Sequence, residues 1–307
     1  MKKIHEPVLL KQALNLLVRN KAGTYFDGTL GFGGHALELL KLLNENGLLV
    51  ATDVDSEAFD YSKKLFRNEN RVKLYKYNFT KIDLITKIES LQGYDGIFAD
   101  LGVSSYQLDK PEAGFTFRQN ARLDMRMDNS LPVTAADVIN SFSEEDIADI
   151  LYKYGEEKKS RLIASKIVKK RINSRIESAD DLSSIITELI PLPYRTKTLA
   201  RVFQALRIFI NNELDNLITF LDKSVNLLKK GGRIVVITYH SLEDRIVKEK
   251  FKFETLDCVC PKDFPVCKCD KEPRLKIITK KPLTPDKTEI QGNPRSRSAK
   301  LRAAERL

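Results

Sequence analysis

The stretch that decides the fold is Asp27–His35, which reads DGTLGFGGH. A short apolar strand at Thr24–Phe26 leads into it, and the helical pattern of Ala36–Leu43 follows it. Glycines at such a turn let the backbone approach a ligand, and the helix that begins there offers free N–H groups. Asp53 ends the next strand, about 20 residues beyond Gly31, where an acid receives the ribose hydroxyls of a nucleoside cofactor. The pattern predicts such a cofactor, with a tight turn and a surface aspartate as the alternative.

Two cofactors fit these glycines. The spacing Gly31-x-Gly33-x-x-Ala36 matches the dinucleotide fingerprint, which would make the protein an NAD-dependent oxidoreductase. Asp27, however, places a carboxylate beside the loop, where it would repel the pyrophosphate of a dinucleotide. S-adenosylmethionine has no phosphate and carries an ammonium and a sulfonium, so an acid beside the loop favours it. We therefore predict S-adenosylmethionine rather than NAD.

Strands and helices alternate along the first third of the chain. Beside the elements already named, the apolar patterns predict helices at 8–18, 57–66 and 81–90, and strands at 48–51, 72–77 and 95–99. Further strands are predicted at 233–238 and, antiparallel, at 274–279. Alternation at this pitch predicts an α/β fold with a parallel, doubly wound sheet.

The stretch between the fourth and fifth strands reads as helical. Its predicted helices cover 135–140, 144–153, 161–172 and 179–189, and an apolar period of three or four residues from 203 to 228 predicts one more, long helix. We therefore divide the chain into the first part of an α/β domain (1–105), an inserted all-α domain (106–200) and the second part of the α/β domain (201–307). The stretch Asn293–Arg302 has four basic residues and no acid, which predicts a mobile or substrate-ordered tail.

The composition makes a polyanionic partner worth considering, with a basic protein that binds no nucleic acid as the alternative. Lysine and arginine number 52 against 42 acids, a net charge of +10, and the isoelectric point is near 9.2. No run approaches the roughly 18 apolar residues that a membrane span needs. The first residues contain no signal-peptide core. We expect a cytoplasmic protein without a membrane role.

The stretch Lys158–Arg175 carries eight basic residues and no acid. We expect the apolar side chains of this helix to anchor it, namely Ala164, Ile167, Val168 and Ile172. Its charged side chains would then face outward, and Lys166, Lys169 and Lys170 are the predicted RNA contacts. A merely solvated helix face is the alternative.

All four cysteines lie in two Cys-x-Cys pairs, Cys258/Cys260 and Cys267/Cys269. The rest of the chain has none, so this is not a disulfide-stapled secreted scaffold. Four thiolates can hold a metal, but the usual spacing in structural zinc sites is Cys-x-x-Cys. We therefore favour a plain or redox-labile loop and predict no metal.

Two further motifs follow predicted strands. Asp100 ends the fourth strand, at the edge where open α/β sheets bind ligands, and is a candidate to orient the cofactor or accept a hydrogen bond from a substrate amine. A helix cap or turn is the alternative. His240 follows the fifth strand at the same edge and is either a substrate contact or structural. No third group beside His240 and Ser241 suggests a hydrolase triad.

Taken together, these motifs resemble the RsmH (MraW) family. The blocks that carry the resemblance span the chain in order: 5–10, 27–35, 100–109, 123–128, 203–208, 240–245 and 293–298. The resemblance implies a Rossmann-like class I methyltransferase sheet with an inserted all-α domain that recognises the substrate. It implies an S-adenosylmethionine-dependent enzyme that methylates the exocyclic N4 of a cytidine in 16S ribosomal RNA, near the decoding centre.

The resemblance also implies site residues. Gly33, Gly34 and His35 would line the methionine end of the cofactor, and Asp53 would hold its ribose. The rest of the implied cofactor set is Phe79 beside the adenine, with Asp100 and Gln107. Many amino-methyltransferases carry an Asp/Asn-Pro-Pro-aromatic turn after the fourth strand, but this chain has Asp100-Leu-Gly-Val, as the family does. The usual mechanism therefore cannot be copied over, and Asp100 is proposed only as a group that positions the amine.

The implied partner is 16S ribosomal RNA or the small ribosomal subunit, with the protein a monomer or homodimer. A non-catalytic ribosome-assembly factor that binds RNA is a further alternative. The intact Asp27, Gly31–His35 and Asp53 argue against it.

Overall fold

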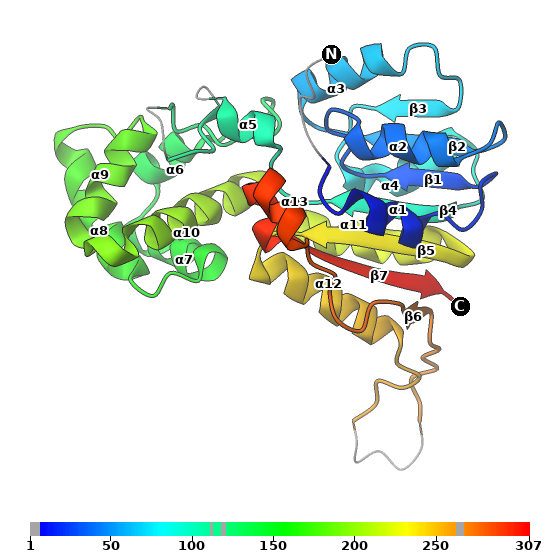
Figure 1. Ribbon diagram of the computed structural model, residues 1–307. Coiled ribbons are helices and arrows are strands. Elements are labelled where there is room, and N and C mark those ends of the chain that lie inside the picture. Colours follow the sequence, from blue (N-terminus) through cyan, green and yellow to red (C-terminus); the bar gives the residue numbers. More distant parts are fainter. Residues whose placement is uncertain (1–6, 111–112, 118–120, 262–266) are drawn as a thin grey trace. The chain divides into compact units, whose positions relative to one another are not determined.

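The computed structural model describes residues 7–110, 113–117, 121–261 and 267–307. The His5-Glu6 pair of the first signature block lies outside these ranges. The chain forms two compact units, drawn in Figure 1: the first unit comprises residues 1–102 and 214–307, and the second unit residues 103–213. Within the described ranges, no helix is both long enough and apolar enough to cross a membrane.

The first unit is built on a seven-stranded sheet with the order β3-β2-β1-β4-β5-β7-β6 (Figure 1). The strands are β1 Thr24–Asp27, β2 Leu48–Thr52, β3 Val72–Tyr75, β4 Tyr94–Asp100, β5 Leu228–Thr238, β6 Leu275–Ile277 and β7 Lys300–Arg306. Strands β1 to β5 are parallel, while β7 runs antiparallel to both of its neighbours, β5 and β6. The predicted α/β class is confirmed. Because the strand order reverses between β1 and β4, their carboxyl ends mark the edge where such sheets bind ligands.

Helices cover both faces of this sheet. One face carries α1 Leu10–Leu17, α2 Gly34–Leu42 and α3 Ser56–Leu65, and the other carries α4 Ile82–Ile88, α11 Glu213–Leu227 and α12 Ser241–Glu254. Strand β5 shows the alternation, since Val235 and Ile237 pack in the first layer and Ile234 and Val236 in the second. Three short helical segments complete the unit: η1 Phe79–Lys81, α13 Lys287–Gly292 and η3 Pro294–Ser298. A sheet buried on both faces explains the continuous apolar runs of its strands.

The second unit is helical and has its own apolar core. Its helices are α5 Ser105–Asp109, α6 Ala135–Ser141, α7 Glu144–Gly155, α8 Ser160–Asn173, α9 Ala179–Leu189 and α10 Leu192–Asn211. Side-chain caps fix where several begin: the Thr134 hydroxyl accepts the Asp137 N–H at α6, and the Ser143 hydroxyl accepts that of Asp146 at α7. Phe115, Leu123 and Met125, from the loop before α6, are buried in the same core.

The unit boundaries and one helix differ from the sequence prediction. The predicted boundary at residue 200 falls inside α10, and the second unit ends at 213. The single long helix predicted over 203–228 is wrong, because α10 ends at Asn211, the next residue Asn212 has a left-handed φ of 49°, and α11 follows. Asparagine tolerates this conformation better than most residues. The apolar period continues across the break and so conceals it.

The predicted mobile tail is also wrong. Residues 300–306 form β7, hydrogen-bonded between β5 and β6, and Leu301 and Ala303 are fully buried. The basic residues of this stretch do not all face solvent: the Arg302 guanidinium lies 2.6 Å from the carboxylate of Asp244 in α12, and Lys300 lies 3.2 Å from it. The charge pattern of residues 293–302 could not reveal this strand, because Asp244, which pairs with Lys300 and Arg302, lies far away in the sequence.

Candidate functional site at the carboxyl ends of β1, β2 and β4

The glycine-rich loop follows β1 and leads into α2. Gly33 precedes the helix with φ +80°, and a Cβ there would lie 2.9 Å from the ring of Phe66. A Cβ on Gly34 would lie 2.7 Å from Cγ of Pro7. Both contacts are closer than carbon atoms approach each other, so packing alone requires glycine at these positions. Their role toward the methionine end of the cofactor stays a prediction.

Asp53 lies just after β2 and holds this loop in place. Its Oδ2 accepts the Gly31 N–H at 2.6 Å, and its Oδ1 accepts the Asp55 N–H at 2.8 Å. The Val54 N–H also acts on this carboxylate, whose two oxygens together offer about four lone-pair sites, so capacity remains for a further donor. Burial raises the pKa of Asp53 to about 6. These carboxylate oxygens are acceptors, which fits a ribose diol that would donate two hydroxyl hydrogens.

Asp27 ends β1 and is buried, with 1% of its surface exposed. Its Oδ1 accepts the Thr29 N–H at 3.0 Å. Burial raises the pKa of Asp27 to about 7, and the charge of Asp53 adds to the shift. The Thr29 hydroxyl oxygen in turn accepts the N–H of Asp100 at 2.7 Å, which joins the ends of β1 and β4.

Asp100 ends β4 and shares a hydrogen bond with a residue that follows β5. The Tyr239 hydroxyl donates to Asp100 Oδ1 at 2.8 Å. The other oxygen, Oδ2, lies 3.7 Å from Nδ1 of His35. Burial raises the pKa of Asp100 to about 7, despite the Tyr239 hydrogen bond, which lowers it.

His35 is fixed from its other side. Its Nε2 lies 3.1 Å from the carbonyl oxygen of Val8, so Nε2 carries the hydrogen, because a carbonyl only accepts. Its ring packs 4.7 Å from that of Phe98 in β4. The segment before α1 therefore sets the orientation of a predicted cofactor residue.

Asp27, Asp53 and Asp100 form what we call the acidic cluster. Each follows or ends one of three neighbouring parallel strands, and each has a raised pKa. A raised pKa means that the folded protein disfavours the ionised form of the carboxyl group. A bound cation would stabilise that ionised form. The pyrophosphate of a dinucleotide would add to the repulsion.

Phe79 lies in η1, with its ring 4.9 Å from that of Phe220 in an edge-to-face contact. It also packs beside Gly28, where a Cβ would lie 3.0 Å from Cβ of Phe79. The structure thus places Phe79 in the first unit with Gly33, Gly34, His35, Asp53 and Asp100. Its contact with adenine stays a prediction.

Gln107 belongs to the second unit, in the short helix α5. Its side-chain oxygen accepts the Ser104 N–H at 2.9 Å, and its own N–H donates to the Ser104 hydroxyl at 3.1 Å. This capping box gives Gln107 a local structural role. Its part in the cofactor set stays a prediction.

His240 caps helix α12. Its Nδ1 accepts the Glu243 N–H at 3.4 Å, and the Glu243 carboxylate accepts the Tyr239 N–H at 2.8 Å. Nε2 of His240 is buried and makes no hydrogen bond with any described residue, although Oε1 of Glu243 lies 3.2 Å away. The cap accounts for the residue structurally, and its contact with substrate stays a prediction.

The basic helix α8 packs through three of its four predicted anchors, since Ala164 and Ile167 are buried and Val168 packs against the core of the second unit. Ile163, Ala164 and Ile167 are buried, whereas Ile172 is 78% exposed. The predicted anchor at Ile172 is wrong, because the helix packs through the turn before it. Among the predicted RNA contacts, Lys166 lies 3.2 Å from a carboxylate oxygen of Glu188 in α9. Lys169 and Lys170 are exposed.

Sequence reasoning missed Tyr239 and Thr29, which orient the acidic cluster. Tyr239 is the first residue after β5, and Thr29 lies within the glycine-rich loop. The rule that parallel strands share their carboxyl edge, applied to hydroxyl groups as well as acids, would have singled out Tyr239.

The strand order, the antiparallel β7 and the glycine-rich loop define a Rossmann-like class I methyltransferase. The chain is 48% identical over 304 residues to the ribosomal RNA small subunit methyltransferase H of Caldicellulosiruptor bescii, covering 99% of both chains. It is 45% identical over 306 residues to the protein of the same name from Halothermothrix orenii, covering 99% of this chain and 98% of that one. Residues 2–307 match the family model described as the MraW methylase family, and the chain belongs to this family of S-adenosylmethionine-dependent methyltransferases.

Proposed function

We propose that this protein transfers the methyl group of S-adenosylmethionine to the exocyclic N4 of a cytidine in 16S ribosomal RNA, near the decoding centre. The observation that carries the proposal is the acidic cluster at the glycine-rich loop. Asp27, Asp53 and Asp100 place negative charge where a ligand with a sulfonium and an ammonium gains most and a dinucleotide loses most. The cluster therefore supports methyl transfer rather than NAD-dependent oxidoreduction.

Two observations support an RNA substrate. The relatives named above are methyltransferases of small-subunit ribosomal RNA. The chain also has a net charge of +10, and α8 exposes Lys169 and Lys170, which suits contact with phosphates. The choice of cytidine N4 rests on the signature blocks of the sequence. Because the relatives are bacterial proteins that act on ribosomal RNA, we place the enzyme in the cytoplasm, as a monomer or homodimer.

The cofactor residues that we propose are those of the first unit, together with Gln107. Asp53 would accept the ribose hydroxyls through the lone-pair capacity that the backbone N–H groups of Gly31, Val54 and Asp55 leave free. Gly33, Gly34 and His35 would face the methionine end, and Phe79 the adenine. When bound, the cofactor supplies an electrophilic methyl group on a positively charged sulfur.

Asp100 is the group that we propose to position the amine. The N4 lone pair of cytidine is delocalised into the ring, so the enzyme must align it and accept its hydrogens. Tyr239 holds Asp100 Oδ1, which leaves Oδ2 for an N–H donor. Because the pKa of Asp100 is raised to about 7, its carboxylate can also take up the proton that the nitrogen releases near neutral pH. The nucleophile belongs to the substrate, so no cysteine is assigned a catalytic role.

The test is mass spectrometry of nucleosides from small-subunit RNA of cells with and without the protein. We expect N4-methylcytidine to be lost with the protein and restored by the wild type. Asp100→Asn should restore little of it, and the matched control, Tyr239→Phe, should restore more. Unchanged N4-methylcytidine would contradict the proposed substrate. Calorimetric titration separates the alternatives, because an oxidoreductase would bind NAD more tightly than S-adenosylmethionine and a non-catalytic assembly factor would bind neither.

A further inference from the structure

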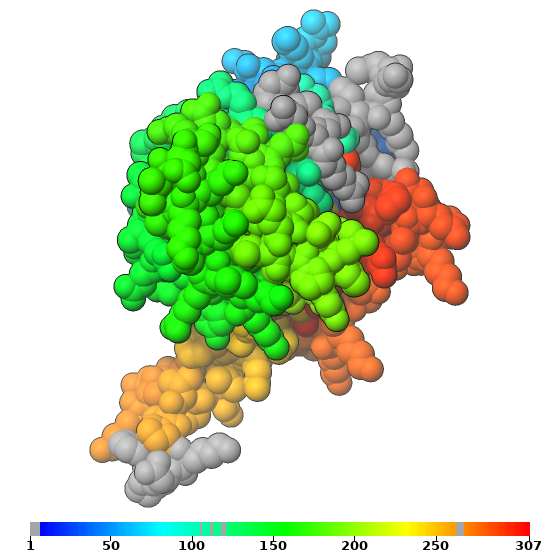
Figure 2. Space-filling view, turned by 90° about the vertical axis from the view of Figure 1, so that its left-hand side faces the viewer, coloured from blue at the N-terminus to red at the C-terminus, as the bar shows by residue number. Residues whose placement is uncertain are grey.

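The segment between α12 and β6, residues 255–274, is fixed by hydrogen bonds where its two ends meet. There the Arg274 N–H donates to the Glu254 carbonyl at 2.8 Å, and the Arg274 guanidinium donates two hydrogen bonds of 2.7 Å to the buried Glu254 carboxylate. Between these ends, none of the described residues of the segment is buried. Figure 1 shows residues 255–261 and 267–274 leading away from the sheet, and Figure 2 shows these residues, yellow-orange to orange, at the surface. Apolar packing among these residues therefore does not hold them together.

The four cysteines nevertheless gather within this segment. The Sγ atoms of Cys258, Cys260, Cys267 and Cys269 all lie within 4.8 Å of one another. The Sγ of Cys269 lies 3.8 Å from that of Cys258 and 3.5 Å from that of Cys267, and all four cysteines are free. These distances are far longer than a disulfide bond of about 2.05 Å. Four sulfurs at a zinc–sulfur distance of about 2.3 Å stand about 3.8 Å apart at the corners of a tetrahedron.

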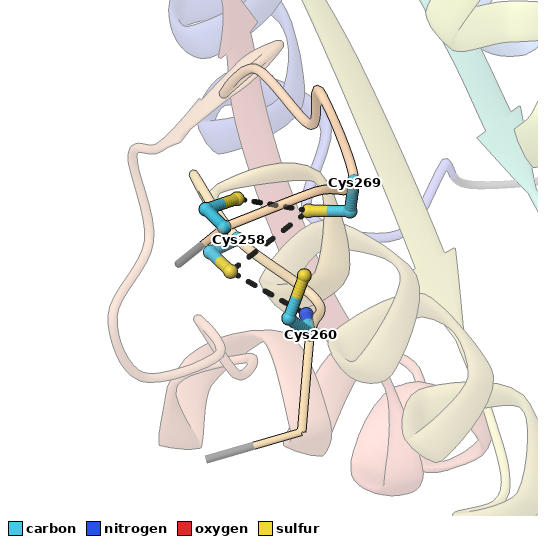
Figure 3. Close-up of side chains that lie close together, drawn as sticks. Cys258, Cys260 and Cys269 are labelled. Atoms are coloured by element: carbon cyan, nitrogen blue, oxygen red, sulfur yellow. Dashed lines mark hydrogen bonds between the residues drawn. The ribbon is translucent and has the colours of Figure 1, made fainter. Parts of the chain in front are cut away.

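Backbone N–H groups point at three of the sulfurs. Val259 donates to Cys269 Sγ at 3.3 Å, Lys268 donates to Cys260 Sγ at 3.4 Å, and Cys260 donates to Cys258 Sγ at 3.4 Å. The dashed lines in Figure 3 join Cys258 both to Cys269 and to Cys260. Donors of this kind stabilise negative charge on sulfur and orient thiolate ligands around a metal.

We propose that Cys258, Cys260, Cys267 and Cys269 bind one zinc ion in a tetrahedral structural site. Free cysteines are usually among the most buried residues, whereas these four are exposed or partly exposed and still converge. Four thiolates in a tetrahedron select zinc or iron among the biological metals. The Cys-x-Cys spacing in the sequence argued against a metal site. The fold nevertheless brings the two pairs together, so that each pair can supply two of the four ligands.

The site is structural because four protein ligands leave no open position for a substrate or water. Each thiol that binds zinc releases its proton to solvent, so four thiols release four protons and zinc affinity falls as the pH is lowered. The metal would hold this segment together, which apolar packing among its described residues does not do. The site is independent of the proposed methylation chemistry.

The test begins with the metal content of the full-length protein, purified without chelators from cells supplied with zinc. Elemental analysis should find about one zinc per chain in the wild type and a loss of at least about 90% in the variant Cys258→Ser/Cys269→Ser. The matched control is Val259→Ser, which changes an exposed side chain of the same segment and leaves every sulfur in place. It should keep its zinc.

A second measurement needs no variant. Chelator-treated wild type titrated with Co²⁺ should develop sulfur-to-cobalt charge-transfer bands and the intense visible bands of a tetrahedral site. Zinc should then displace the cobalt, and a protease should cut within residues 255–274 faster in the metal-free protein. Substoichiometric zinc with no cobalt bands, stoichiometric iron in place of zinc, or disulfides in protein prepared without oxygen would each overturn the proposal.

Discussion

We predict that Asp27→Asn stabilises the ligand-free protein at alkaline pH and weakens binding of the methyl donor. Asp27 is buried, and its pKa is raised from 3.8 to about 7. The folded protein therefore keeps a proton on Asp27 at pH values where the unfolded chain has released it. By linkage, the free energy of unfolding falls as the pH rises from about 4 to about 7, and it stays low above that range. Asparagine cannot ionise, so the free energy of unfolding of the variant does not fall in this way as the pH rises.

The magnitude follows from the shift. About three pKa units at 1.36 kcal/mol each correspond to about 4 kcal/mol at pH 8. The asparagine Oδ1 can still accept the Thr29 N–H, so little is lost in exchange. For a unit of this size, we expect the unfolding midpoint of the variant to lie about 8–16 °C above that of wild type at pH 8, and to match it near pH 4.

The assay is thermal unfolding of the ligand-free protein from pH 4 to pH 8, with calorimetric titration of S-adenosylmethionine at pH 8. A matched control is Asp95→Asn. Lys229 lies 2.8 Å from Asp95, and hydrogen bonds from Lys229 and the Thr24 N–H lower the Asp95 pKa despite its partial burial. That variant should be less stable than wild type over this whole pH range, because the stabilisation from a lowered carboxylate pKa is lost only below about pH 4. If wild type and Asp27→Asn show the same pH dependence, Asp27 is not a strained carboxylate and our account of the acidic cluster fails.

Three further outcomes can be measured. Asp53→Ala should weaken S-adenosylmethionine binding by roughly tenfold to a thousandfold in calorimetry, because two charge-assisted hydrogen bonds to the ribose are lost, while the protein still folds. Changing Lys169 and Lys170 to glutamine should flatten the log–log salt dependence of binding to small-subunit RNA by up to about 1.4–1.8, at about 0.7–0.9 per lost phosphate contact. Unchanged slopes would mean a merely solvated face. Gly33→Ala should cost about 1–3 kcal/mol of stability, seen as a lower denaturation midpoint, because the new Cβ would contact Phe66 at a positive φ. A variant as stable as wild type would show that the loop can relax.

The alternation of elements in the first unit was readable from the sequence because buried parallel strands leave continuous apolar runs, as at Leu48–Ala51. The ends of those strands could also be placed together, since parallel strands share one carboxyl edge. The break at Asn212 and the buried strand at 300–306 could not be predicted. One is a single left-handed residue within an unbroken apolar period, and the other depends on pairing with strands and with Asp244 far away in the sequence.

The candidate site shows the same limit. The acids at positions 27, 53 and 100 could be named from their places after strands. Their raised pKa values and the Tyr239 hydrogen bond depend on burial and on contacts between distant segments. The cysteines show the limit most clearly, because the spacing along the chain disfavoured a metal and only the fold brings the four sulfurs together.

The place of β7 in the sheet sets the order in which the chain can fold during synthesis. Strand β7 lies between β5 and β6, yet both neighbours leave the ribosome before it does. Until residues 300–306 emerge, β5 has one edge unpaired and β6 has no partner strand. Unpaired edges attract other chains, and contacts that wait for a distant segment form slowly. The nascent first unit is therefore most vulnerable to aggregation before residues 300–306 have been synthesised and paired, the stage at which chaperone binding should matter most.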